Sequence, residues 1–182
     1  HMSNKPLDCS DLDNHMGKRM QPARLKVPLS DTDIRRWAQA MHYPNRVHYD
    51  DEFAAQSRFG RLVAPQSFPV ATDDAHGTGP SCVGFIPNSH LIFGGDEWWF
   101  HSTRIYGGDL IHNERIPLDY AVKETRFAGP TCFQRGDNFY YHQHGDLISA
   151  VHRLECGPHG HFGLAEADVA ADQAIHRARG QH

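Results

Sequence analysis

Histidine is the residue type of this chain best suited to chemistry, because its side chain titrates near neutral pH and also binds metals. The 182-residue sequence contains 15 histidines, and two pairs are separated by a single residue, His142/His144 and His159/His161. In a β-strand this spacing places both rings of a pair on one face, as a metal site needs. No cysteine or carboxylate stands beside either pair at a metal-site spacing. We therefore interpret both pairs as exposed polar histidines and predict no metal site and no cofactor.

The four cysteines are far apart in the sequence and form no C-x-x-C pair. They are Cys9, Cys82, Cys132 and Cys156. This spacing indicates neither a zinc knuckle nor a disulfide framework, so we predict reduced thiols in a cytoplasmic protein. The sequence also lacks the phosphate loop G-x-x-x-x-G-K-[ST], the dinucleotide-binding turn G-x-G-x-x-G and the serine elbow G-x-S-x-G. We do not expect the chemistries that depend on those motifs.

Composition excludes further classes of function. Lys and Arg number 18 and Asp and Glu 22, which gives a net charge of −4 with histidine neutral. Such a chain offers no basic surface for a nucleic-acid backbone or an anionic membrane. The longest apolar runs are only a few residues, against about 18 for a membrane-spanning helix, and residues 3–13 contain no apolar core of a signal peptide. We expect a soluble protein with one compact domain.

The N-terminal part of the chain predicts an arm followed by a capped helix. Residues 1–22 lack periodicity, and we interpret them as a flexible N-terminal arm that is mobile or loosely docked. Ser30 offers an N-cap with Asp33 three residues on, and the apolar spacing that follows predicts a helix ending around His42.

The rest of the sequence predicts two more helices and then a β-meander. Helices are expected over residues 50–59 and 66–75, the second being the most apolar of the chain. Residues 157–182 form a C-terminal tail, for which we predict a helix in the Ala-rich part 164–179. Strand-like segments are 91–93, 97–101, 115–127, 131–141 and 147–154. This order indicates an α+β fold in which the 66–75 helix lies against the sheet.

The stretch Trp37–Phe68 reads WAQAMHYPNRVHYDDEFAAQSRFGRLVAPQSF. It resembles the MaoC-like (R)-specific enoyl-thioester hydratases and dehydratases of the hot-dog superfamily, whose pattern D-x-N-P-x-H is followed by a small residue. Asn45, His48 and Ala54 match the Asn, the His and the small residue. The following S-R-F-G-x-x-V-A-P is typical of the N-terminal-type, FAS1-like dehydratase branch, as is FGGDEWWF further on.

The resemblance implies a hot-dog fold over residues 23–156, with an antiparallel sheet wrapped around a central helix. It also implies hydration or dehydration of an enoyl or 3-hydroxyacyl thioester carried by coenzyme A or an acyl-carrier protein. The protein would act as a homodimer or as a heterodimer with another hot-dog subunit.

The resemblance further assigns the site residues. His48 would be the base that activates water, with Asn45 beside it in the motif. The thioester carbonyl would bind at Ala64–Ser67, where Gln66 and Ser67 supply backbone N–H groups because proline has none.

The sequence departs from the family pattern at Tyr43, where the family has its catalytic Asp, and at Arg46, where it has Pro. A tyrosine with a pKa of about 10 is a poor base at neutral pH, but it can donate or orient by a hydrogen bond. A shift of the loop could instead bring His42 or Asp50 to the site. Three functions stay open: an active hydratase, a non-catalytic partner subunit, and a repurposed thioesterase, decarboxylase or cyclase of polyketide or lipid metabolism.

Overall fold

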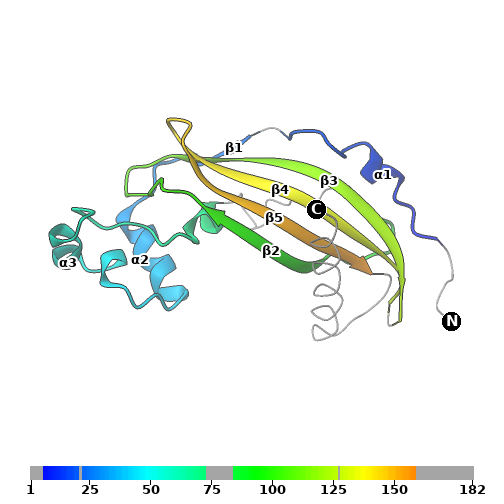
Figure 1. Cartoon of the computed structure of the whole chain (residues 1–182), viewed down its shortest axis with the longest axis horizontal. Coiled ribbons are helices and arrows are strands. Elements are labelled where there is room, and N and C mark those ends of the chain that lie inside the picture. Colours follow the sequence, from blue (N-terminus) through cyan, green and yellow to red (C-terminus); the bar gives the residue numbers. More distant parts are fainter. Residues whose placement is uncertain (1–5, 21, 73–83, 127, 159–182) are drawn as a thin grey trace.

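A five-stranded antiparallel sheet with the strand order β1-β3-β4-β5-β2 forms the body of the protein (Figure 1). The computed structural model describes residues 6–20, 22–72, 84–126 and 128–158. The strands are β1 (Ala23–Arg24), β2 (Ile92–Phe100), β3 (Ile111–Thr125), β4 (Gly129–His142) and β5 (Leu147–Pro158). Strands β3, β4 and β5 follow one another as antiparallel neighbours, as the alternating sequence pattern predicts.

Strand β2 is continuous where the sequence suggests two short strands interrupted by Gly94 and Gly95. The register with β5 shifts between Phe93 and Gly95, which is a β-bulge, and Gly95 has a φ of 143°. A Cβ on Gly94 would lie 2.8 Å from the carbonyl oxygen of Leu154. The two glycines therefore allow a close approach of two strands inside the sheet, and they do not mark a turn.

The helices are short, and they precede most of the sheet in the chain. They are α1 (Ser10–Asp13), α2 (Asp31–Ala40), η1 (Arg46–His48), α3 (Asp51–Gln56) and η2 (Phe68–Thr72), where η marks a 3-10 helix. The predicted capping box of α2 is confirmed, because Ser30 and Asp33 bond to each other's backbone. Helix α3 ends before Ser57, earlier than predicted, since the Ser57 hydroxyl donates to the carbonyl of Ala54 and its backbone is extended.

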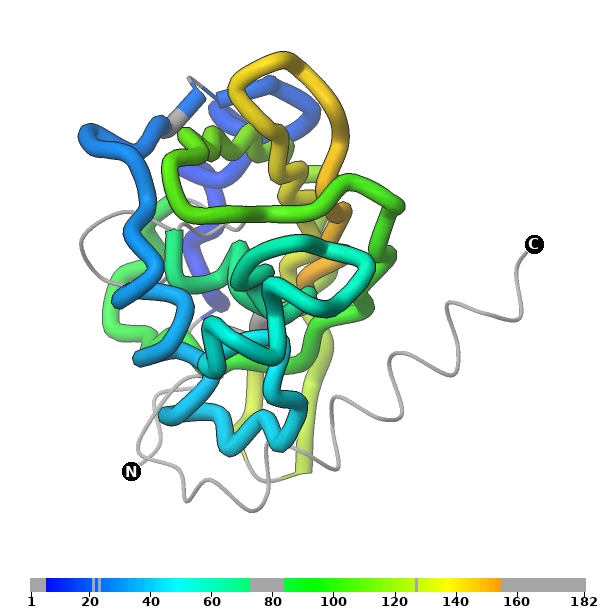
Figure 2. The backbone as a smooth tube through the Cα atoms, turned by 90° about the vertical axis from the view of Figure 1, so that its left-hand side faces the viewer, coloured from blue at the N-terminus to red at the C-terminus, as the bar shows by residue number. Residues whose placement is uncertain are grey.

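Phe68 connects the helical part to the sheet. It is 2% exposed, and it packs into the main core. That core contains Ile34, Ala64, Phe68, Ile105, Ile111, Tyr140, Ile148 and Val151. The helix predicted over residues 66–75 is observed as the five-residue η2, and the predicted part beyond residue 72 lies outside the described residues. Figures 1 and 2 show α2 and α3 together at one end of the sheet.

The N-terminal segment lies along β3 and is packed against the sheet over its described residues, 6–20. The N–H of Gly17 donates to the carbonyl of Pro117 at 2.7 Å, and that of Met20 to Arg115 at 2.9 Å. Of the two alternatives for the arm, mobile or loosely docked, these residues show docking. The reason is that β3 presents unpaired backbone groups, which the segment before β1 satisfies.

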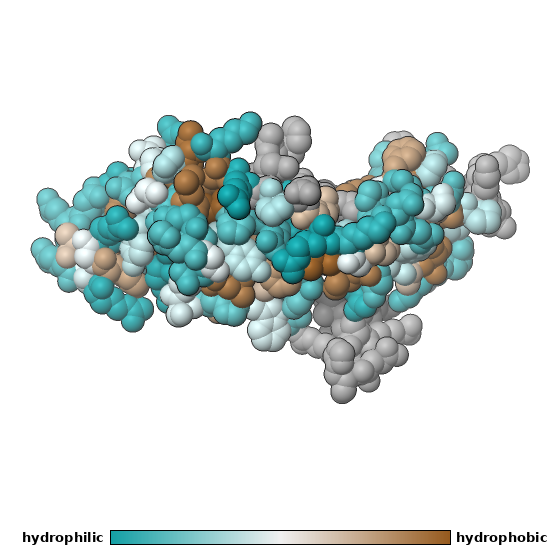
Figure 3. Space-filling model, turned by 90° about the horizontal axis from the view of Figure 1, so that it is seen from above, coloured by the Kyte–Doolittle hydropathy of each residue, from teal (hydrophilic) through white to brown (hydrophobic). Residues whose placement is uncertain are grey.

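Several other expectations concern the surface and the C-terminus. Figure 3 shows a largely hydrophilic surface with hydrophobic patches between the polar residues. Within the described ranges, no helix is long and apolar enough to cross a membrane. Strand β5 continues the sheet to Pro158, slightly past the predicted domain end at residue 156. The pair His159/His161 and the predicted 164–179 helix lie outside the described residues.

Candidate active site

The end of α2 determines which side chain of the following loop reaches the interior. His42 adopts a left-handed backbone with a φ of 53°. Its N–H donates to the carbonyl of Gln39 at 3.2 Å, and the N–H of Tyr43 donates to that of Ala38 at 2.9 Å. This pair of bonds is a Schellman motif, which ends a helix and redirects the chain. Because His42 is exposed and Tyr43 half-buried, Tyr43 and not His42 is available to an interior site.

Tyr43 belongs to a hydrogen-bonded group with Ser67 and Trp37. The hydroxyl oxygens of Tyr43 and Ser67 are 2.7 Å apart, and the indole Nε1–H of Trp37 donates to Ser67 Oγ at 3.0 Å. The indole ring packs edge-on against Phe68, with ring centroids 6.3 Å apart. An indole N–H can only donate, so Ser67 accepts from Trp37 and keeps its own hydrogen for another bond. The group ties α2 and its C-terminal turn to the segment that leads into η2.

His48 is held in one tautomer by the backbone. Its Nδ1 lies 2.7 Å from the carbonyl oxygen of Val63. A carbonyl can only accept, so Nδ1 carries the hydrogen of the neutral ring and Nε2 is the basic nitrogen. The N–H of Val63 donates in turn to the carbonyl of Val47 at 3.2 Å, which fixes the two segments to each other. The ring of Tyr43 lies edge-on to that of His48, with centroids 5.8 Å apart.

The predicted thioester-binding segment offers two backbone donors. The N–H of Ala64 is already used, because it donates to the carbonyl of Ile105 at 2.9 Å. Among the described residues, the N–H groups of Gln66 and Ser67 have no acceptor. They belong to a turn that precedes a 3-10 helix, whereas the sequence predicts the start of a longer α-helix. The donors are therefore turn amides, and Ser67 adds its side-chain hydroxyl beside them.

A pocket opens next to this turn. The turn contributes Ala64, Pro65 and Gln66, and the end of β2 with the loop after it contributes the opposite wall. The remaining lining residues are Phe100, His101, Thr103, Arg104, Ile105 and Ile148. Tyr43 and His48 do not line this pocket. Gln66 lines the pocket and the adjacent Ser67 belongs to the hydrogen-bonded group, so the turn contributes to both.

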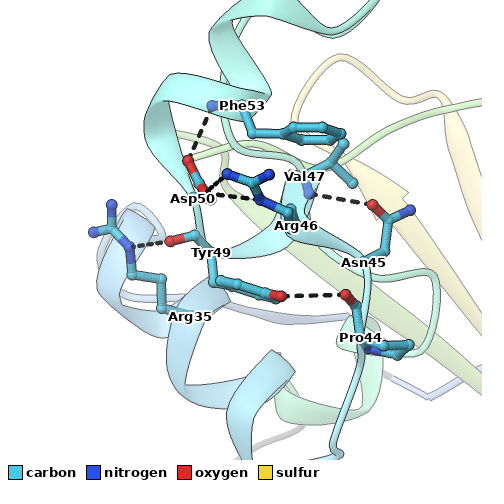
Figure 4. A network of polar contacts seen from close by, with 8 residues as sticks. All are labelled: Arg35, Pro44, Asn45, Arg46, Val47, Tyr49, Asp50 and Phe53. Atoms are coloured by element: carbon cyan, nitrogen blue, oxygen red, sulfur yellow. Dashed lines mark hydrogen bonds and ion pairs between the residues drawn. The ribbon is translucent and has the colours of Figure 1, made fainter.

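The other motif residues form a separate polar network (Figure 4). Asn45 is exposed, and its side-chain oxygen accepts the N–H of Val47 at 3.2 Å, which caps η1. Asp50 accepts the N–H of Phe53 at 3.0 Å and two bonds from the guanidinium of Arg46 at 3.0 and 2.6 Å. The amide of Phe53, together with Arg46, lowers the pKa of Asp50. Asp50 is thus committed to capping α3 and does not replace the motif Asp.

His142 and His144, at the end of β4 and in the turn after it, were both predicted to be exposed, and only one of them is. The His142 and His144 rings are adjacent, with centroids 5.0 Å apart, and His144 is exposed. The side chain of His142, however, is only 14% exposed, and its Nε2 lies 3.2 Å from Asp109 Oδ1. The interpretation as an exposed residue is wrong for His142, because the loop that carries Asp109 packs over it. Within the described part of the chain, no three His, Cys, Asp or Glu residues are arranged to hold a metal.

One family model matches most of the chain. The family model described as "FAS1-like, dehydratase domain region" matches residues 14–151. The chain belongs to this FAS1-like dehydratase family. A comparison with curated protein sequences finds no match.

Solved structures show the fold of this FAS1-like dehydratase. It is similar to the R-hydratase PhaJ1 from Pseudomonas aeruginosa, with a TM-score of 0.59 and 18% identity over 80% of this chain and 83% of that one. It is similar to the ChsH1–ChsH2 complex from Mycobacterium tuberculosis, with a TM-score of 0.62 and 17% identity over 81% of this chain and 88% of that one. It is also similar to a MaoC-like dehydratase from Rhodospirillum rubrum, with a TM-score of 0.57 and 19% identity over 84% of this chain and 99% of that one. The protein has the α+β hot-dog fold.

The two departures of this FAS1-like dehydratase from the motif each have a partner in the structure. Tyr43, in place of Asp, is bonded to Ser67, and Arg46, in place of Pro, forms an ion pair with Asp50. Tyr43 connects the loop to the segment before η2, and Arg46 connects it to the N-cap of α3. The loop that carries His48 is therefore held on both sides.

Sequence reasoning missed two participants in the site, Trp37 and the carbonyl of Val63. The position of Trp37 on the apolar face of α2 is explained by packing alone, so the apolar periodicity gives no reason to expect that its indole N–H also donates a hydrogen bond to Ser67. The available signal is that a half-buried indole N–H requires an acceptor, and Ser67 in the predicted binding segment is a candidate. No sequence signal marks a backbone carbonyl as the partner of a histidine.

Proposed function

We propose that this FAS1-like dehydratase adds water to an enoyl thioester, or removes it from a 3-hydroxyacyl thioester, with His48 as the base. The carrier would be coenzyme A or an acyl-carrier protein. The observation that carries the proposal is the 2.7 Å bond from Nδ1 of His48 to the carbonyl of Val63. In the neutral ring this bond places the hydrogen on Nδ1, leaves the lone pair on Nε2 and fixes the orientation of the ring, which is what a general base requires.

In the hydration direction, the oxygen of a water molecule attacks C3 of the enoyl thioester, and Nε2 of His48 takes one of its protons. The electron pair of the double bond moves toward the thioester carbonyl and gives an enolate. The imidazolium of His48 then returns its proton to C2, so that one water has been added across the double bond. The hydroxyl of Tyr43 orients the water, because a phenol donates well but is a poor base at neutral pH.

The enolate oxygen would be stabilised by the turn before η2. The N–H groups of Gln66 and Ser67 are free of other acceptors among the described residues, so they are available for the developing charge. Ser67 is also the residue that contacts Tyr43. This contact would keep the oxyanion donors and the water-orienting hydroxyl in one rigid group, which lowers the cost of reorganisation during the reaction.

Hydration of crotonyl-CoA, followed by loss of the enoyl-thioester absorbance, tests the proposal. His48→Ala should lower turnover by about 10²-fold or more, which is typical for removal of a positioned acid–base group. His42→Ala is the matched control, because it removes a nearby histidine that is exposed, and it should leave turnover unchanged. Equal activity of His48→Ala and the unmodified protein on every thioester tested would refute the assignment of His48.

We also infer that the protein pairs with a second hot-dog subunit through β2. This strand is an edge of the sheet, and its Phe93 and Trp99 side chains are 59% and 54% exposed. A long edge strand with exposed aromatic residues favours pairing with another strand. The similarity to the ChsH1–ChsH2 complex supports such an arrangement. Light scattering should detect a dimer of this chain, or a heterodimer once the partner is added, and a stable monomer under both conditions would contradict the inference.

A second candidate function is a non-catalytic subunit of such a pair, and the observation that favours it is Tyr43 at the position of the motif Asp. In that case Tyr43→Asp should raise a near-zero hydration rate, since it restores the missing carboxylate. If Tyr43 orients the water of an active enzyme, the same substitution should lower the rate. The two candidates therefore predict opposite signs in one assay on one variant.

A further inference from the structure

Two cysteines that are far apart in the sequence meet at the N-terminal segment. Cys9 is the N-cap residue of α1, and Cys132 lies on β4. They are 8% and 1% exposed, and both pack with Leu12 in a small hydrophobic cluster. Their thiols are in hydrogen-bonding contact, and neither forms a disulfide in this structure. The sequence predicts reduced thiols and gives no sign that two of them lie together in the fold.

The surroundings hold this contact from several sides. The hydroxyl of Tyr120 donates to Asp13 Oδ1 at 2.8 Å, which ties α1 to β3. The N–H of Phe85 donates to Asp11 Oδ2 at 2.8 Å, which ties α1 to the segment before β2. A Cβ added to Gly84 would lie 2.8 Å from Leu12 Cδ1, so this segment packs tightly on the helix. Helix α1 is thus enclosed between the sheet and the segment that leads into β2.

We propose that Cys9 and Cys132 form a reversible disulfide in the folded protein when a small-molecule disulfide such as oxidised glutathione is present. The Cys9 thiolate attacks one sulfur of the oxidant and releases the first glutathione thiolate. The Cys132 thiolate then attacks the sulfur of Cys9 and releases the second. The protein loses two hydrogens, and one disulfide molecule is reduced to two thiols.

The order of the steps follows from burial. Cys9 is the more accessible of the two thiols, so it is the one that meets the oxidant. Burial raises the pKa of the Cys9 thiol, so little thiolate is present at neutral pH and the first step is slow. The second step needs no diffusion, because Cys132 is already in contact.

The main effect of the Cys9–Cys132 disulfide would be on the stability of the folded protein. This bond closes a loop that contains the helices, β1, β2, β3 and the start of β4, and a loop on the order of 100 residues loses much entropy in the unfolded chain. With the temperature response typical of a chain of this size, we expect the midpoint of thermal unfolding to rise by about 10 °C. Oxidation would therefore fix the N-terminal segment against the sheet.

The test uses a variant in which Cys82 and Cys156 are replaced by Ser, so that only the proposed pair remains. After incubation with oxidised glutathione, the intact mass should fall by two hydrogens, and non-reducing peptide mapping should join the Cys9 and Cys132 peptides. The melting temperature should rise and should return to its starting value after reduction with dithiothreitol. Addition of Cys9→Ser or Cys132→Ser should abolish both effects.

Two results would overturn the proposal. One is the uptake of glutathione by both cysteines without an internal bond, and the other is the persistence of two free thiols after prolonged oxidation. If the Cys82→Ser/Cys156→Ser variant does not fold, the same mapping on the unmodified protein decides the question. A linked Cys9–Cys132 peptide supports the proposal there, and any other pairing pattern refutes it.

Discussion

The contact between Tyr43 and Ser67 can be tested by a double-mutant cycle on stability. Tyr43→Phe removes only the phenolic hydroxyl, and Ser67→Ala removes only the serine hydroxyl. In the parent, the two hydroxyl oxygens are 2.7 Å apart in a half-buried site, and Ser67 also accepts from Trp37. The cycle compares the parent, the two single variants and the double variant, and it isolates the energy that depends on both hydroxyls.

The expected energies follow from what each substitution leaves behind. Tyr43→Phe should lower the free energy of unfolding by only about 1 kcal/mol, because Ser67 loses its bond to Tyr43 but retains the bond from Trp37. Ser67→Ala should lower the free energy of unfolding by about 2 kcal/mol, because both the Trp37 N–H and the Tyr43 O–H then lose the hydroxyl to which they bond. The double variant should again cost about 2 kcal/mol, since the hydroxyl of Tyr43 is already absent. The coupling energy is then about 1 kcal/mol.

Urea unfolding followed by tryptophan fluorescence measures all four proteins. Tyr49→Phe combined with Ser67→Ala is the matched control, because the Tyr49 hydroxyl donates to the carbonyl of Pro44 at 3.2 Å in a residue that is 44% exposed. That pair should be additive within about 0.5 kcal/mol. Additive effects of the Tyr43 and Ser67 substitutions would refute the hydrogen bond and, with it, the coupling of the water-orienting group to the oxyanion turn.

Three further substitutions test how the surrounding elements are held, each by urea unfolding. His42→Gly should raise the free energy of unfolding by about 1 kcal/mol, because glycine adopts the left-handed backbone at φ 53° without steric cost; no gain would contradict the Schellman turn. Asp50, whose pKa is lowered by the Phe53 amide and Arg46, stabilises the fold at neutral pH and loses this effect as pH falls below about 4. Asp50→Asn should therefore be less stable than the parent at pH 7 and equal to it in strong acid, and a gap that does not change with pH would count against this. Gly94→Ala should cost about 1–3 kcal/mol, because its Cβ would lie 2.8 Å from a carbonyl oxygen on β5; an unchanged midpoint would refute the close approach.

The elements of the fold were predictable where the signal is local. The capping box at Ser30 and the alternation of β3 and β4 depend on residues a few positions apart, and the structure confirms them. The Gly94–Gly95 pair was misjudged as an interruption because its reason is a contact with Leu154, far along the chain. The place where the N-terminal segment docks could not be predicted for the same reason, since its bonds go to the edge of β3.

The candidate site also has a part that the sequence predicts and a part that depends on contacts between distant residues. The motif identifies His48 as the candidate base, but only the fold shows that Val63 fixes its tautomer. Trp37 fits the apolar face of α2 correctly, and its ring does pack on Phe68, yet the same side chain also donates to Ser67. Periodicity describes which face of a helix is buried, and it contains no information about the partner of a polar atom on that face.

Position 43 determines how this site can differ from the family pattern. An Asp here would add a carboxyl group, whereas Tyr43 provides a phenolic hydroxyl that is hydrogen-bonded to Ser67. Of the residues assigned to the proposed reaction, only His48 has an imidazole side chain, so in this proposal the proton that His48 takes from water is the one that it returns to C2. If this single-group route is too slow, the second titrating group must come from a partner subunit. The hydrogen-bond network around Tyr43 is compatible with both outcomes, because it joins Tyr43, Ser67 and Trp37 and contains no carboxylate or imidazole.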